Sequence, residues 1–268
     1  MTAGPIRVGI GGWTYAPWRG PFYPDDLPAK RELEFASRQV TAIEINGTFY
    51  RTQSAKSFAK WRDETPDGFV FTVKGHRAVV NKSKLAEAGE TVEWFVKSGI
   101  AELGDKLGPI NWQLAPFKKF DPDDVGAFFA LLPAEIGGVK LRHAIEVRHR
   151  GFVDPAFVAL AAKHKVAIIY ADSDDHPAIA DVTADFVYAR LQRSSLAEEA
   201  GYSPDALDDW ARRARIWSEG GTPLDLDTVA EKEPAKKAAR PVFLFFIAGD
   251  KEKAPAAAVA LIARLAKA

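Results

Sequence analysis

Short apolar runs alternate along the chain with longer stretches that have the periodicity of amphipathic helices. Eight of these runs have the length and the β-branched or aromatic character of a single strand. They are Arg7–Gly11, Ala42–Asn46, Phe69–Lys74, Ile110–Leu114, Ala144–Arg148, Val166–Tyr170, Phe186–Leu191 and Val242–Ile247. Strands that alternate with helices in this way are typical of a parallel sheet covered by helices.

Seven helices are predicted between and after these strands. They are Leu27–Gln39, Ala55–Glu64, Thr91–Leu103, Asp123–Leu132, Asp154–His164, Pro204–Ser218 and Pro255–Lys267. Ser54, Asp154 and Ser203 are good N-caps for three of them. The sixth strand is followed by a loop-like segment over residues 172–184 with at most one helical turn. Residues 220–240, rich in proline, charge and alanine, predict an exposed insertion before the last strand.

Eight strands that alternate with helices over 268 residues predict the α/β class and a single (β/α)8 TIM-type barrel that spans residues 1–268. The alternative is an open doubly wound sheet, whose usual sign is a glycine-rich turn that opens a helix after the first strand. Gly9, Gly11 and Gly12 are followed instead by Trp13-Thr14-Tyr15. Bulky aromatic side chains do not suit a pyrophosphate cradle, so dinucleotide binding is not supported.

Polar residues recur at every second position near the carboxyl ends of the predicted strands, where barrel enzymes carry their sites. A charge on a strand with apolar neighbours is costly to bury unless it is paired. The charges therefore form either an ion network that fills the barrel top or a functional site, and their number favours a site. The candidate catalytic residues are Glu44, Glu146 and Lys74. The candidate ligand-binding residues are Trp13, Tyr15, Asn46, Tyr50, Gln113, Arg148, Tyr188 and Arg190.

Several chemistries fit these residues. Glu44 or Glu146 can act as a general base if burial raises its pKa. The same two carboxylates are a minimal glycosidase pair, but the sequence does not give their separation. A Schiff base at Lys74 requires a lowered pKa, which nearby glutamates would oppose. Carboxylates after the fifth, sixth and eighth strands, Glu146, Asp172 and Asp250, resemble a divalent-metal set. A cation, Arg190, on the seventh strand argues against this set, so neither metal nor cofactor is expected.

The amino-acid composition excludes several classes of protein and several kinds of site. The chain is 47% hydrophobic and 27% charged and has no cysteine, which excludes disorder throughout, disulfides, thiolate metal sites and cysteine nucleophiles. The 36 basic and 36 acidic residues give no net charge, which disfavours nucleic acid as a partner. The start lacks a leader pattern, and the apolar stretch Ala254–Ala263 is too short for a bilayer. We expect a cytoplasmic protein without a membrane partner.

The chain resembles the domain of unknown function 72 family, also called YecE-like. The resemblance rests on Gly9–Tyr15 with Trp18 and Phe22-Tyr23-Pro24, Glu44–Arg51, Trp61 with Thr65-Pro66, Phe69–Lys74, Leu107-Gly108-Pro109, Gln113–Pro116, Glu146–His149 and Tyr188–Leu191. It implies a TIM-type barrel but no activity, because none is established for the family.

This member departs from the family pattern at three places. Gln192-Arg193 stands where the family usually has His-Gly, and Phe246-Ile247-Ala248 stands where it has Phe-Asn-Asn. A histidine expected after the third strand is replaced near Asn81. These changes remove polar groups from the barrel mouth, which indicates a different ligand from that of the relatives or a loss of activity.

Two functions follow as hypotheses. The first is that the barrel mouth binds or transforms a small polar, anionic or sugar-like molecule, with Arg148, Arg190 and Lys74 on anionic oxygens. The second is a non-catalytic or single-stranded nucleic-acid-binding protein. Its aromatic and basic surface would consist of Trp13, Tyr15, Tyr50, His76, Arg77, Lys74 and Arg51. Whether the protein is an enzyme and what oligomeric state it has stay open.

Overall fold

The computed structural model describes residues 3–230 and 238–267. Its main sheet is parallel throughout and has the order β8-β7-β4-β3-β2-β1-β11-β10-β9. These strands are β1 (Ile6–Gly11), β2 (Ala42–Ile45), β3 (Val70–Lys74), β4 (Leu107–Gln113), β7 (His143–Glu146), β8 (Ala167–Ile168), β9 (Tyr170–Asp172), β10 (Val187–Leu191) and β11 (Val242–Phe246). A single residue, Ile169, separates β8 from β9, so the two ends of the sheet belong to one run of chain. The sheet therefore closes as a barrel with eight strand positions, and the predicted TIM-type barrel is confirmed.

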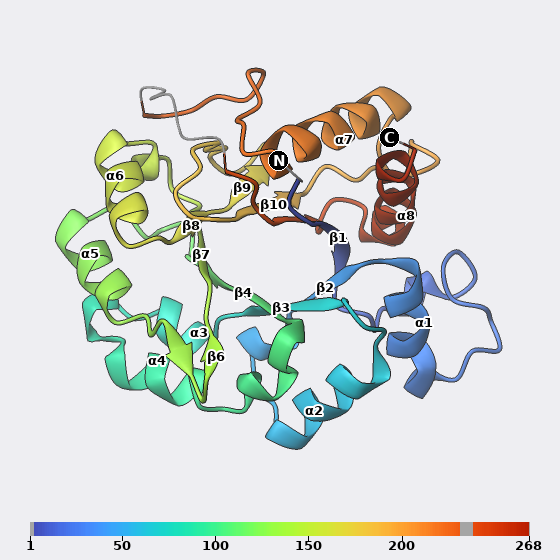
Figure 1. Cartoon of the computed structure of the whole chain (residues 1–268), viewed down its shortest axis with the longest axis horizontal. Helices are drawn as coiled ribbons and strands as arrows, with labels where there is room; N and C mark the ends of the chain where they lie inside the picture. Colours follow the sequence, from blue (N-terminus) through green and yellow to red (C-terminus); the bar gives the residue numbers. More distant parts are fainter. Residues whose placement is uncertain (1–2, 231–237, 268) are drawn as a thin grey trace.

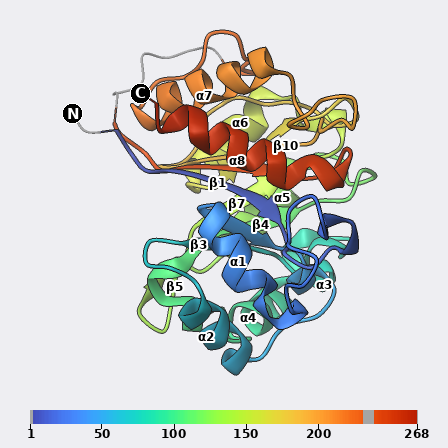
Figure 2. The same ribbon diagram turned by 90° about the vertical axis from the view of Figure 1, so that its right-hand side faces the viewer.

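Helices surround the strands on the outside of the barrel, and α7 and α8 pack side by side (Figures 1 and 2). The helices are α1 (Glu32–Gln39), α2 (Ala55–Glu64), α3 (Arg77–Val80), α4 (Gly89–Val96), α5 (Pro122–Ala130), α6 (Pro155–Lys163), α7 (Pro204–Ser218) and α8 (Ala254–Leu265). A small antiparallel hairpin, β5 (Glu135–Ile136) and β6 (Val139–Lys140), lies outside the barrel sheet. All eight predicted strand runs are confirmed, the sixth as the pair β8 and β9.

Helix ends follow local side-chain chemistry. Ser54, Asp154 and Ser203 accept backbone N–H bonds at the starts of α2, α6 and α7, which confirms the three predicted N-caps. The predicted helix over Thr91–Leu103 is wrong in one respect. It breaks after α4 at Gly99, whose φ of 113° lies in the left-handed region, and continues as 3-10 turns over Ile100–Lys106.

The barrel interior has two layers, an apolar one toward the amino ends of the strands and a polar one toward their carboxyl ends. The apolar layer is a cluster of alternate strand residues: Ala42, Ala144, Ala167, Ile169, Phe186, Tyr188, Phe243 and Phe245. Gly9 makes room for the Phe245 ring, because a Cβ at Gly9 would lie 3.0 Å from Phe245 Cε1 and 2.1 Å from the Ala42 carbonyl oxygen. This apolar plug leaves only the carboxyl ends of the strands for polar side chains.

The sixth unit lacks a helix, because residues 173–186, all of them described, contain neither helix nor strand. This confirms the predicted loop over 172–184 except for Asp172, which ends β9. In the described part of the segment before β11, the Val229 and Ala230 amides donate to the Asp181 carboxylate at 2.7 and 3.0 Å. These bonds hold this part of the segment against the loop that contains Asp181. Residues 231–237 of the predicted insertion lie outside the described residues.

Among the described residues, none of the helices combines the length and the apolar character that a membrane span requires.

Candidate functional site

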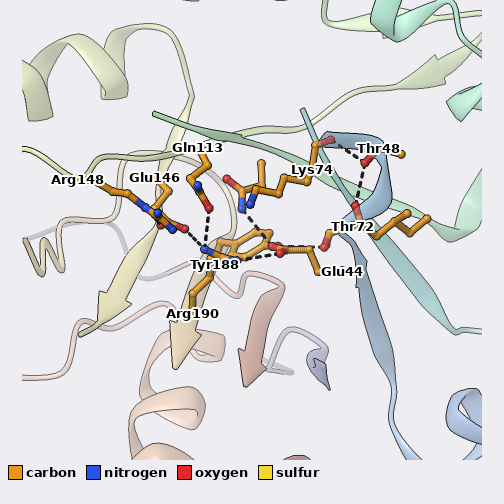
Figure 3. Close-up of polar contacts among 11 residues, drawn as sticks. Glu44, Thr48, Thr72, Lys74, Gln113, Glu146, Arg148, Tyr188 and Arg190 are labelled. Atoms are coloured by element: carbon orange, nitrogen blue, oxygen red, sulfur yellow. Dashed lines mark hydrogen bonds and ion pairs between the residues drawn. The ribbon is translucent and has the colours of Figure 1, made fainter. Parts of the chain in front are cut away.

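Arg190, on β10, lies between two carboxylates that come from opposite sides of the barrel (Figure 3). Its Nη2 donates to Glu44 Oε1 at 3.0 Å, and its Nη1 donates to Glu146 Oε2. The same Nη1 also donates to Gln113 Oε1 at 3.2 Å. Arg190 is 3% exposed, and neither glutamate is exposed at all. A guanidinium with several donors is suited to joining two carboxylates in this way.

Neutral groups and a second arginine complete this cluster. Glu44 Oε2 accepts from the Tyr188 hydroxyl and from Asn111 Nδ2, the latter at 3.1 Å. The Thr72 hydroxyl lies 2.9 Å from the Tyr188 hydroxyl. Arg148, at the edge of the cluster, donates from Nε to Glu146 Oε1 at 2.8 Å. We call these eight residues the mouth network: Glu44, Thr72, Asn111, Gln113, Glu146, Arg148, Tyr188 and Arg190.

The sequence predicted six of these eight residues as site candidates and missed Thr72 and Asn111. Both could have been found, because Thr72 shares a strand face with Lys74, and Asn111 shares one with Gln113. The structure brings together Glu44, Glu146, Gln113, Arg148, Tyr188 and Arg190 from the predicted list.

The pKa shifts in the mouth network keep its ion-paired groups charged. Burial alone raises the pKa of Glu146, but Arg190 and Arg148 outweigh it, so the pKa of Glu146 lies below its usual value. Burial lowers the pKa of Arg190, but the Glu146 and Glu44 carboxylates outweigh it and hold that pKa above its usual value. Burial and Glu44 raise the pKa of Tyr188 well above its usual value. Glu146 therefore does not meet the condition of a raised pKa that was set for a general base.

Lys74 ends β3 beside the mouth network and differs from the other cations there. Its Nζ lies 4.5 Å from the centre of the Phe49 ring. Among the described residues, this Nζ has neither a hydrogen-bond acceptor nor a carboxylate partner. Burial and the nearby Arg190 lower the pKa of Lys74 to about 8. Glu44 and Glu146 do act to raise this pKa, as the sequence predicts, but burial and Arg190 outweigh them.

Three buried polar atoms in the mouth network and in Gln192 lack a partner among the described residues. They are the donors Arg190 Nε and Gln192 Nε2 and the acceptor Asn111 Oδ1. A buried polar group without a hydrogen bond is unfavourable and is uncommon in folded proteins. Gln192 is one of the two residues that replace the His-Gly of the family pattern.

The other candidate ligand-binding residues lie outside the mouth network. The Trp13 ring packs against Trp61, with centroids 5.0 Å apart, and Tyr15 packs against Trp18 at 5.5 Å. Tyr50 is 65% exposed. Asn46 lies over the first strand, where a Cβ at Gly11 would be 2.7 Å from Asn46 Nδ2. The structure places these four residues around the barrel mouth without a hydrogen bond to the mouth network.

The three carboxylates weighed as a metal set have separate partners. Asp172 lies 3.3 Å from Arg193 Nε and accepts from the Tyr202 hydroxyl at 3.1 Å. Asp250 accepts from the Leu196 amide at 2.6 Å. Residues 3–230 and 238–267 contain no group of three histidine, aspartate or glutamate side chains placed to hold a metal ion. Arg193, a departure from the family pattern, thus pairs with a carboxylate at the end of β9.

Curated relatives match a little more than half of the chain, and solved structures match nearly all of it. The chain is 25% identical over 157 residues to the UPF0759 protein YunF of Bacillus subtilis (strain 168), which covers 57% of this chain and 54% of that protein. It is 24% identical over 147 residues to the UPF0759 protein YecE of Escherichia coli (strain K12), 55% of this chain and 50% of the relative. The match thus spans about half the length of these curated relatives.

A solved structure shares the whole architecture. The crystal structure of a DUF72 family protein from Thermotoga maritima MSB8 superposes with a TM-score of 0.72 at 18% identity, over 98% of this chain and 100% of that chain. The family model described as "Protein of unknown function DUF72" matches residues 7–268. The chain is therefore a member of the DUF72 family.

Proposed function

We propose that the barrel mouth binds a small anionic molecule that also carries hydroxyl groups, such as a sugar phosphate or a hydroxy acid. The observation that carries this proposal is the balance of charge around Lys74. Arg190 and Arg148 already pair with the two carboxylates of the mouth network. Lys74 adds a third cation without a carboxylate of its own, so the mouth has a surplus of one positive charge when Lys74 is protonated.

An anionic group of a ligand would neutralise this surplus positive charge. A half-buried ammonium is poorly solvated, and an anionic oxygen that reaches Lys74 Nζ would replace the lost hydration. Arg148 lies at the edge of the cluster with its side chain 22% exposed, so it remains accessible from solvent while it pairs with Glu146. Two cations at the same end of the barrel favour a phosphate or carboxylate over a neutral ligand.

Neutral hydrogen-bonding groups at the barrel mouth favour a ligand that also carries hydroxyl groups. Asn111 Oδ1 is an acceptor without a partner, and Gln192 Nε2 is a donor without one. A hydroxyl group can donate to the first and accept from the second, which a fully deprotonated anion such as a carboxylate cannot do. This combination of donors, acceptors and cations supports a polyol anion as the ligand class.

Isothermal titration of the protein with glucose 6-phosphate, glucose and inorganic phosphate tests the proposal. We expect the sugar phosphate to bind more tightly than phosphate and glucose to bind weakly or not at all. Lys74→Met should weaken binding of the sugar phosphate at least tenfold. Lys251→Met is the matched control, because Lys251 Nζ lies 4.5 Å from the Tyr15 ring but is not part of the mouth network. Equal binding of glucose and its phosphate, or equal loss in both variants, would contradict the proposal.

The nucleic-acid hypothesis is an alternative outcome of the same experiment. Titration with a single-stranded oligonucleotide at low and high salt would detect it, since phosphate contacts give a strong salt dependence. Tight oligonucleotide binding together with unmeasurable binding of small anions would favour that function instead.

A further inference from the structure

We infer that Lys74 is a nucleophilic amine that forms a Schiff base with an aldehyde or ketone group of the anionic ligand. This inference rests on the proposed function, because the same mouth must first hold the anion. It adds a reaction to that binding site and names the residue that carries it.

The surroundings of Lys74 suit a reactive amine. A carboxylate partner would hold Lys74 protonated, but the two carboxylates that act on its pKa are both paired with arginines. Glu44 is paired with Arg190, and Glu146 is paired with both Arg190 and Arg148. The Nζ instead lies over the face of the Phe49 ring, 4.5 Å from its centre. Among the described residues, no acceptor holds its protons and no carboxylate pairs with it.

Charged groups around Lys74 act in both directions on its protonation. Arg190 and Arg148 disfavour the ammonium form, whereas Glu44 and Glu146 favour it, and burial disfavours it most. The result is a pKa of about 8. At neutral pH the neutral fraction of Lys74 is then on the order of a hundredfold larger than that of an exposed lysine, whose pKa is about 10.4.

The reaction needs nothing beyond the amine and the carbonyl compound. The Nζ lone pair attacks the carbonyl carbon and forms a C–N bond, and a proton passes from nitrogen to the former carbonyl oxygen to give a carbinolamine. Loss of this hydroxyl as water, with the second amine proton, leaves the imine. One carbonyl oxygen and two protons leave as one water molecule, and no oxidant or reductant takes part.

A lysine that only binds the anion and a lysine that also reacts with it would both strengthen binding. The test must therefore detect the covalent bond itself. The full chain is incubated near pH 7.5 with glyoxylate or with glyceraldehyde 3-phosphate, and sodium cyanoborohydride reduces any imine. Intact mass then counts the adducts, and peptide mapping locates them. We expect one adduct per chain, on Lys74, that forms at least tenfold faster than adducts on exposed lysines. Inorganic phosphate should slow its formation by competition.

Two variants sharpen the result. Lys74→Met should lose the fast adduct, and Lys251→Met should keep it. Lys251 is a stringent control because burial also lowers its pKa and it also lies over aromatic rings, those of Tyr15 and Trp18. Fast modification of Lys251 as well as Lys74 would show only a general effect of burial and would overturn the inference. Because the mapping is done on the unaltered protein, the test does not depend on how well Lys74→Met folds.

Parallel titrations with glycolate and glycerol 3-phosphate, which lack the carbonyl group, separate this inference from the proposed function. Lys74-dependent binding of these analogues without a covalent adduct from the carbonyl compounds refutes the Schiff base and leaves anion binding intact. If neither binding nor a Lys74 adduct is seen, both proposals fail.

Discussion

Arg190 and Glu44 meet inside the barrel, with Arg190 Nη2 3.0 Å from Glu44 Oε1, although their strands are not neighbours in the sheet. Arg190 reaches Glu146 as well, so one guanidinium joins β10 to β2 and β7. All three side chains are buried, and a charge left there without its partner would be strongly unfavourable. The mouth network therefore has a structural role in addition to any role in binding.

Glu146→Gln should lower the free energy of unfolding by about 3–5 kcal/mol, because it removes the negative charge that compensates buried Arg190 and half-buried Arg148. Urea unfolding followed by circular dichroism at pH 7 measures the loss. Arg148→Met is the matched change, and it should have a smaller effect because Glu146 keeps Arg190. The double variant gives the coupling between the two residues. Unchanged stability in Glu146→Gln would mean that the ion pairs contribute little to the fold.

His143 should make the protein sensitive to mild acid. Its Nδ1 accepts from Trp112 Nε1 at 3.1 Å, and its Nε2 donates to the Pro133 carbonyl at 2.7 Å, so the neutral ring is fully bonded. Burial lowers the pKa of His143 to about 4, while in the unfolded chain it is near 6.5. The unfolded state thus binds the proton first. Stability conferred by the neutral ring is complete above pH 6.5 and is lost as the pH falls toward 4, by up to about 3 kcal/mol.

Urea unfolding at several pH values between 7 and 4 checks this expectation. His143→Gln keeps one acceptor and one donor at this position but does not titrate, so its stability should decline less over the same interval. A variant that shows the same decline as the unaltered protein would assign the acid sensitivity to other groups.

Ala248→Gly should stabilise the protein. Ala248 has φ of 72°, in the left-handed region that a residue with a Cβ enters at a cost of roughly 1–2 kcal/mol. Glycine adopts this conformation freely but loses more entropy on folding, so we expect a net gain of about 0.5–1 kcal/mol. The midpoint of urea unfolding measures the gain. Ala260→Gly, in the middle of α8, is the control of opposite sign, since glycine destabilises a helix interior by about 1 kcal/mol. Destabilisation by both changes would contradict the argument.

Binding of the anionic ligand should weaken as the pH rises through the pKa of Lys74. The free protein carries the ammonium form below about pH 8 and the neutral amine above it. Because the surplus positive charge is lost on deprotonation, the affinity for a sugar phosphate should fall by up to tenfold per pH unit above this value. Titrations from pH 6.5 to 9.5 measure the trend, and Lys74→Met should remove it. A flat profile in the unaltered protein would show that Lys74 does not contact the anion.

Much of the fold was predictable from local pattern. The strands at Ala42–Ile45 and Val187–Leu191 alternate apolar and polar residues or form short β-branched runs, and Ala55–Glu64 has its N-cap directly before it. These signals depend on residues close together in the chain, which the sequence displays directly. The break at Gly99 was missed, because a glycine within an apolar periodic stretch has no unique local reading.

The sequence by itself determined the barrel, the end of the barrel at which polar side chains gather, and most of the residues that gather there. Only the tertiary structure decided which of them pair. Glu44, Glu146 and Lys74 are all ionisable residues on strand faces, yet Arg190 and Arg148 take both carboxylates and leave Lys74 without one. The pairing depends on distances across the barrel between residues far apart in the chain, and the pKa of each group follows from that pairing and from burial. No local pattern contains those distances, so the sequence could show that the glutamates would tend to raise the pKa of Lys74, but it could not show that burial and Arg190 outweigh them.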